Sequence, residues 1–438
     1  MMTLTQPIAQ SIICKLNSLS SHVAKCCFQV VTLCLLLSFS SLVFSQNVTP
    51  YTGKKLVQAS QLEQEGHLPK AIEVLSSFTP KNDYDTAFVN RVLGIYYWQA
   101  EQPKQSIKAL TTSVNLKALE PKAQWQTQRM LGDILYSQQD FSGAVSAYQK
   151  TLAVKYDATG KEKSSHAKDV NQLYFRIAAS YYQQQNWQQV KRYIVLYRAQ
   201  DAKQKLQALR IQVVAELRLK QWKNAESTLS NLIRLEPDNK SWWQQQISAQ
   251  LQQGRNEAAL STYALAKKQA LDFTANDYKA LSQLYAQNKI PERAARILGE
   301  MFNQFPETKT IENHKLQAQY WQVAREWPKA IETWQSLAHR DAQYYWPLSQ
   351  LLIQQKHYVE ANKVIDKAKP YAKVKEFGLA KIQLLYRLEK YNDALAEAKR
   401  LNEKQPSASA QTWIVFLENK EQQDEPSKVE QNSEVFAA

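Results

Sequence analysis

The side chains that most often perform chemistry are scattered in this sequence of 438 residues. No two histidines stand four residues apart with a glutamate, as they do in a zinc-binding helix; outside the N-terminal segment they are His67, His166, His314, His339 and His357. No Gly-x-Ser-x-Gly, Gly-x-Gly-x-x-Gly or Walker A string occurs, and only 9 glycines are present to form a phosphate-binding loop. The sequence therefore predicts no catalytic residue, no metal site, no cofactor and no enzymatic activity.

A second set of side chains is suited to binding and recurs at regular intervals. It consists of cations, aromatic residues and glutamines: Arg91, Trp98, Arg129, Tyr136, Tyr182, Arg210, Lys279, Gln283, Lys315 and Gln319, with Gln350 and Gln383 in the last repeats. Cations bind carboxylates, and a glutamine amide can both donate to and accept from a peptide backbone. The net charge of +15 also favours anionic partners.

A repeated pattern of about 34 residues must position these side chains. Each repeat contains a small or medium residue, the anchor, that opens a second helix: Ala71, Ser106, Ala144, Val190, Ala225, Ala259, Ala294, Ala330, Ala361 and Ala394. Twelve residues earlier, a small residue such as Gly94 or Gly132 allows two helices to pack closely. Prolines fall two or three residues before four anchors, at the expected first turn of the second helix: Pro69, Pro103, Pro291 and Pro328.

This spacing and these residue types resemble the tetratricopeptide repeat (TPR), a helix-turn-helix of 34 residues. The resemblance implies an all-α, right-handed α-solenoid of about ten helical hairpins, closed by a capping helix at residues 411–420. It also implies that the first helix of each pair lines a concave groove, into which the cations, aromatic residues and glutamines above would point. Two alternatives stay open for them: exposed cations that only solubilise the protein, and aromatic side chains that only pack between repeats.

The two ends of the chain differ in composition from the repeats. Residues 1–45 contain all four cysteines, no Asp, Glu or Arg, two lysines and an apolar stretch from Phe28 to Phe44, which predicts a signal peptide cleaved before Gln46. An uncleaved membrane anchor is the alternative. The predicted organisation is thus a signal peptide at 1–45, a TPR solenoid at 46–420 and a disordered polar tail at 421–438.

A more specific resemblance covers Gln221 to Phe302, where Trp242 and Trp243 follow Pro237-Asp238 and precede "LYAQNKIPERAA". It looks like the periplasmic TPR proteins that are encoded beside TonB, ExbB and ExbD components in marine gammaproteobacteria. The resemblance implies a non-catalytic periplasmic scaffold that binds an extended segment of a TonB-type complex, or of another envelope protein, during iron-siderophore uptake. A binder of an anionic envelope polymer, or a cell-wall coordinator, is the alternative. An exported protein is not expected to bind nucleic acid. The alternative for the two tryptophans is that both simply begin a first helix, with one facing the core and one facing the groove.

Overall fold

The computed structural model describes residues 48–424, and every regular element in that range is a helix. This confirms the all-α fold class. The predicted signal peptide lies outside the described residues, as do residues 425–438 of the predicted tail. The last helix, α22 (Ala408–Asp424), ends at Asp424, whereas the sequence placed the end of the ordered region at residue 420.

The described residues divide into two compact units, unit one up to Thr262 and unit two from Tyr263 onward. The boundary falls inside helix α13 (Asn256–Lys268). The sequence predicted a single solenoid over residues 46–420, because the repeat spacing continues through this helix without a proline or glycine that would mark an interruption.

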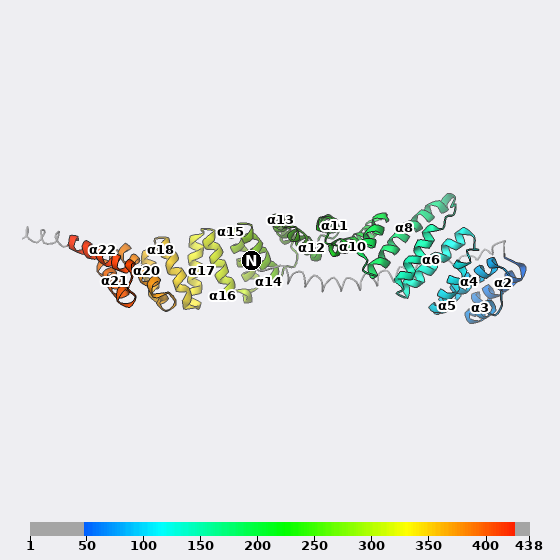
Figure 1. Ribbon diagram of the computed structural model, residues 1–438, viewed down its shortest axis with the longest axis horizontal. Coiled ribbons are helices and arrows are strands. Elements are labelled where there is room, and N and C mark those ends of the chain that lie inside the picture. The colour runs from blue at the N-terminus through cyan, green and yellow to red at the C-terminus, as the bar shows by residue number, and fades with distance from the viewer. Residues whose placement is uncertain (1–47, 425–438) are drawn as a thin grey trace, which may run out of the picture. The chain divides into compact units, whose positions relative to one another are not determined.

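The helices alternate along the chain between a first and a second helix, and α16 and α17 are two such helices that pack together (Figure 1). The first helices are α2 (Pro50–Gln64), α4 (Asp83–Gln99), α6 (Pro121–Ser137), α8 (Gly160–Gln183), α10 (Ala202–Arg218), α12 (Lys240–Gln252), α14 (Ala275–Gln287), α16 (Ile311–Val323), α18 (Tyr345–Gln354) and α20 (Val374–Arg387). The second helices are α3 (Leu68–Ser76), α5 (Pro103–Asn115), α7 (Phe141–Ala153), α9 (Trp187–Leu196), α11 (Trp222–Leu235), α13, α15 (Pro291–Gln304), α17 (Trp327–Arg340), α19 (Tyr358–Val364) and α21 (Tyr391–Lys404). Short 3₁₀ helices are η1 (Pro306–Thr308), η2 (Ala342–Tyr344) and η3 (Ile365–Tyr371).

The anchors are the most deeply buried positions of the repeat. All ten have 0% exposure, including the polar Ser106 and the larger Val190. Ser106 satisfies its hydroxyl by donating to the carbonyl of Gly94 on the preceding helix at 2.6 Å. The predicted repeat frame is therefore confirmed at every anchor.

The turn between the two helices of each pair contains a residue in the left-handed region, throughout residues 48–424. The residue five positions before each anchor has a positive φ: Gly66, Glu101, Gln139, Gln185, Lys220, Gly254, Lys289, Arg325, Lys356 and Glu389. At the end of α4, the Gln102 amide donates to the Tyr97 carbonyl at 2.8 Å and the Glu101 amide donates to the Trp98 carbonyl at 3.1 Å. These bonds are typical of a helix that ends in a left-handed residue.

Glycine is needed where the two helices of a pair approach most closely. A Cβ atom on Gly94 would lie 2.5 Å from the Leu110 side chain, and one on Gly132 would lie 2.6 Å from the Tyr148 ring. Both glycines are buried in helix interiors, where glycine has the lowest propensity apart from proline. Close packing thus explains their presence.

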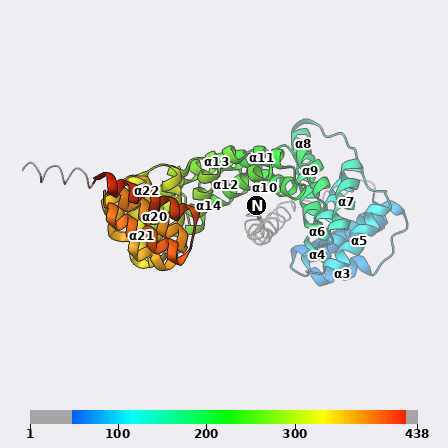
Figure 2. The ribbon, with the colours of Figure 1, turned by 60° about the vertical axis from the view of Figure 1, so that its left-hand side comes forward.

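Three local features complete the two units. The anchors Ala144 and Val190 are farther apart in the chain than other consecutive anchors, and this insertion forms a segment without regular structure at residues 154–159 followed by the long helix α8. The predicted capping helix, part of α22, packs against α20 and α21 (Figure 2) and buries Ala410, Ile414 and Leu417. In the ninth pair the α-helix ends at Val364 and continues as η3, which contains Pro370.

Candidate functional site

The predicted arginines of unit one are already engaged within the protein. All three lie at position −15, fifteen residues before an anchor, and each contacts a side chain from another element: Arg91–Gln126, Arg129–Asp169 and Arg210–Glu236. The Arg91 Nη2 donates to Gln126 Oε1 at 3.1 Å, and the Arg129 Nη1 lies 3.2 Å from Asp169 Oδ1. Burial lowers the pKa of Arg91. The contacts of Arg91 and Arg129 link consecutive first helices, and the contact of Arg210 links α10 to the end of α11.

A buried carboxylate, Asp133, collects two of the cations of unit one. Its exposure is 4%, and its Oδ1 accepts a hydrogen bond of 2.8 Å from the Tyr148 hydroxyl. The guanidinium of Arg176 on α8 pairs with the same oxygen, and the Arg129 Nε lies 3.9 Å from Oδ2. A buried carboxylate needs such partners, because an unpaired charge is costly to remove from water. Asp133 therefore holds α6 and α8 together. It stands four residues after Arg129, but its role was not predicted from the sequence.

The predicted aromatic residues of unit one contribute to helix packing. Trp98 packs on the apolar cluster that contains Leu110 and Val114. The Tyr136 ring lies 5.3 Å from the Phe141 ring, and the Tyr182 ring lies 5.4 Å from the Trp187 ring. Tyr182 is buried, and this burial raises its pKa. These contacts match the packing alternative for the three side chains.

The two adjacent tryptophans begin helix α12, as the sequence indicated. Trp242 is buried and donates from Nε1 to Glu236 Oε2 at 2.8 Å. Trp243 is partly exposed and donates to the Pro237 carbonyl at 2.8 Å. Glu236 therefore serves both Trp242 and Arg210.

The predicted residues of unit two are arranged differently. Lys279, Lys315 and Gln319 are exposed, and Gln283 is partly exposed. Gln350 and Gln383 are also exposed at the same repeat position, −11. Within the described residues, none of these four glutamines has a hydrogen-bond partner and neither lysine has a carboxylate partner. We call the four glutamines and two lysines the glutamine row.

The members of the glutamine row lie on a common side of their helices. Lys279 and Gln283 are four residues apart on α14, and Lys315 and Gln319 are four apart on α16, so each pair shares one helix face. The Lys315 Nζ also lies 6.0 Å from the centre of the Tyr344 ring, which belongs to η2 and directly precedes α18. The row thus presents amide and ammonium groups from neighbouring helices of one compact unit.

A buried histidine lies beside the glutamine row. His314 on α16 has 4% exposure, its Nδ1 has no partner within the described residues, and its ring lies 6.0 Å from the Phe302 ring. Burial, together with the positive charges of Lys309 and Arg340, lowers the pKa of His314 to about 4. The imidazole is therefore neutral at pH 7.

Two further properties concern only residues 48–424. No group of three or more His, Cys, Asp or Glu side chains is gathered there in a way that could hold a metal ion. None of the helices in this range has the length and apolar character that crossing a bilayer requires.

Comparisons with known proteins return helical-repeat proteins. The profile of the bacterial transcriptional activator domain matches residues 145–273. No curated protein matches the chain. A TPR protein from Parabacteroides merdae is 14% identical, with 61% of this chain and 98% of that chain covered and a TM-score of 0.32. The C-terminal part of a TPR protein from Cytophaga hutchinsonii is 18% identical, with 65% and 95% covered and a TM-score of 0.33.

A third similar structure is the TPR2AB domain of yeast Sti1, solved in a complex with pHSP90. It is 12% identical, with 63% of this chain and 98% of that chain covered and a TM-score of 0.33. The fold assignment rests on the helix pairs themselves, with their buried anchors and uniform turns. By these features the chain is a TPR-like helical repeat protein.

Proposed function

We propose that unit two is a non-catalytic interaction scaffold that binds an extended polypeptide segment along the glutamine row. The observation that carries the proposal is the set of four glutamines at one repeat position, whose amides have no partner within the described residues. Each amide can donate to and accept from a peptide group. Lys279 and Lys315, exposed four residues before two of these glutamines, add attraction for acidic side chains.

Acidic and neutral decapeptides of matched composition test this proposal by fluorescence anisotropy with the full chain. We expect the double variant Lys279→Glu, Lys315→Glu to bind an acidic peptide at least about tenfold more weakly, because each lost charged hydrogen bond is worth about 1.5 to 3 kcal/mol. The matched control is Lys356→Glu, Lys390→Glu, which changes two exposed lysines at the turns of unit two by the same charge. Equal loss in both variants, or no loss in either, would contradict a site on this row.

The glutamines distinguish a polypeptide ligand from an anionic polymer, because their amides can form hydrogen bonds with peptide groups. Replacing Gln283, Gln319, Gln350 and Gln383 together by Ala removes the amides and leaves every charge in place. We expect this variant to lose affinity for the acidic peptide and to keep any affinity for polyphosphate, which offers only charge. The reverse result would favour the alternative of an anionic envelope polymer.

We also propose, from the sequence, that the protein is exported and serves a TonB-type uptake system. The composition of residues 1–45 supports export, and the motifs of Gln221 to Phe302 support the TonB association. Cell fractionation with N-terminal sequencing tests export: we expect a periplasmic protein that starts at Gln46. Crosslinking in the periplasm tests the association, with recovery of TonB-, ExbB- or ExbD-like proteins as the expected result.

A further inference from the structure

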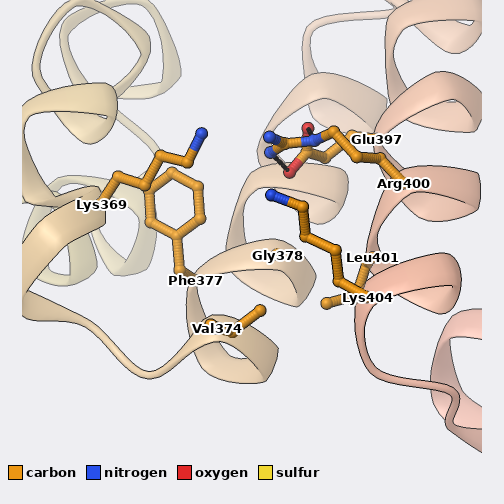
Figure 3. Close-up of a pocket in the computed structure, with 8 residues that line it drawn as sticks. All are labelled: Lys369, Val374, Phe377, Gly378, Glu397, Arg400, Leu401 and Lys404. Carbon is orange, nitrogen blue, oxygen red and sulfur yellow. Dashed lines mark hydrogen bonds and ion pairs between the residues drawn. The ribbon is translucent and has the colours of Figure 1, made fainter.

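Unit two contains a second feature, separate from the glutamine row: a pocket at the edge where two helix pairs meet. Lys369 from η3, Val374 and Phe377 from the first turn of α20, and Arg400 and Lys404 from the end of α21 line it (Figure 3). None of these residues drew attention in the sequence, because they lie at different repeat positions on three different elements. Only the packing of η3, α20 and α21 brings them together.

The charges at this pocket are unbalanced. Glu397 is the single carboxylate in the lining, and it pairs with Arg400. The Arg400 Nε donates to Glu397 Oε2 at 2.9 Å, and the Arg400 Nη2 donates to Glu397 Oε1. Lys369 and Lys404 are exposed and have no carboxylate partner within the described residues. Three cations against one carboxylate leave two positive charges for a ligand.

The rest of the pocket is apolar. Phe377 is 3% exposed and belongs to the core of unit two, so its ring is a fixed part of the wall. Val374 is 55% exposed beside it and adds an accessible apolar side chain to the wall. A ligand here would meet cations on one side and an apolar surface on the other.

The beginning of helix α20 adds to the attraction for an anion. Its N-cap residue, Lys373, makes no side-chain capping bond, so the first amide groups of this 14-residue helix keep their hydrogen-bonding capacity. Free amides and the helix dipole favour negative charge at such an end. Val374, the first residue of α20, lines the pocket.

The pocket and the glutamine row are independent. Gln383 and Val374 both belong to α20 and are nine residues apart. Nine residues at 3.6 per turn place them on opposite sides of the helix. A ligand in the pocket therefore leaves the row accessible, and the result of a test at one site does not decide the other.

We propose that this pocket binds a soluble phosphate monoester that carries an apolar substituent. A phosphate monoester is close to a dianion at pH 7 and matches the two unbalanced positive charges, whereas a single carboxylate would neutralise only one. Lysine ammonium groups suit phosphate as point charges. The apolar substituent would lie against Phe377 and Val374.

Isothermal titration of the full chain with phenyl phosphate tests this proposal. We expect saturable binding that is at least about a hundredfold weaker in the double variant Lys369→Gln, Lys404→Gln, since each of the two changes removes a charged hydrogen bond. The control is Lys363→Gln, an exposed lysine of α19 outside the lining, which should bind as the parent does. Absence of saturable binding, or an equal loss in the control, would overturn the proposal.

Two further ligands test separately whether the pocket binds the phosphate group and whether it binds the apolar substituent. Benzoate keeps the ring and has one negative charge, and inorganic phosphate keeps the charge without the ring, so both should bind more weakly than phenyl phosphate. Val374→Ser should weaken phenyl phosphate and leave inorganic phosphate unchanged, because only the ring contacts this side chain. If benzoate bound as tightly as phenyl phosphate, the result would refute a phosphate site.

Discussion

The first helices of the two units use the same repeat position in opposite ways. At position −15, unit one carries Arg129 and Arg210, whose charges are matched by Asp169 and Glu236. Unit two carries Lys279 and Lys315 there, without a carboxylate partner among the described residues. The residue type at a repeat position therefore does not reveal whether a cation is available to a ligand. A cation is available to a ligand where no neighbouring element supplies a carboxylate that pairs with it.

Position −11 shows the same contrast. In unit one it is buried in three consecutive repeats, as Asp133, Ala179 and Val214. In unit two it holds the glutamines, three of which are exposed. Unit one thus uses this side of its first helices for internal contacts, and unit two leaves it accessible. This difference can be tested through stability, pH dependence and turn substitutions.

The largest effect is expected from removing the buried carboxylate of unit one. Asp133→Ala removes a buried carboxylate that pairs with Arg176 and accepts from the Tyr148 hydroxyl. Loss of one partner of a buried ion pair costs about 3 to 5 kcal/mol. We expect that decrease in the free energy of unfolding, measured by urea unfolding followed by circular dichroism.

Two controls make this comparison specific. Adding Arg176→Met to Asp133→Ala should recover part of the loss, because both charges of the ion pair are then removed together. Gln319→Ala, at the same repeat position in unit two, should change stability by less than about 0.5 kcal/mol, since the side chain is exposed and has no partner. Similar losses for Asp133→Ala and Gln319→Ala would remove the distinction between the units.

A pH effect of intermediate size is expected in unit two. Burial lowers the pKa of His314 to about 4, so below pH 6.5 the unfolded chain binds a proton that the folded chain does not. The free energy of unfolding should therefore fall as the pH decreases from 6.5 to 4, by about 3 kcal/mol from this group.

The contribution of His314 is isolated by difference. The variant His314→Gln cannot titrate in this range, so its free energy of unfolding should decrease less between pH 6.5 and 4 than that of the parent protein. Thermal unfolding at several pH values measures both. Parallel curves for the two proteins would show that His314 is not held in its neutral form by the fold.

The smallest effect should be the same in both units, because their turns are alike. Gln139 in unit one and Lys289 in unit two have φ angles of 64° and 61°, which strain a residue with a side chain. Gln139→Gly and Lys289→Gly should each raise the free energy of unfolding by about 0.5 kcal/mol. The neighbouring control Gln138→Gly, at a φ of −84°, should lower it. A gain in only one unit would mean that the turns differ after all.

The repeat frame was predictable from sequence because it depends on local spacing. Each anchor is a small residue at a fixed distance from a turn, and prolines such as Pro103 and Pro291 begin second helices as expected. The candidate site was predictable only in part. The exposed glutamines were identified, but the fate of Arg129 was not, because its partner Asp169 belongs to an insertion 40 residues away in the chain.

The sequence by itself determined the helical class, the ten anchors and the candidates for a binding surface, since period, residue size and proline placement act within one hairpin. Only the tertiary structure decided which cations are neutralised, where one compact unit gives way to the next, and that Lys369, Arg400 and Lys404 share a pocket. The physical reason is that charge pairing and pockets depend on side chains from different elements, whose meeting is set by how those elements pack.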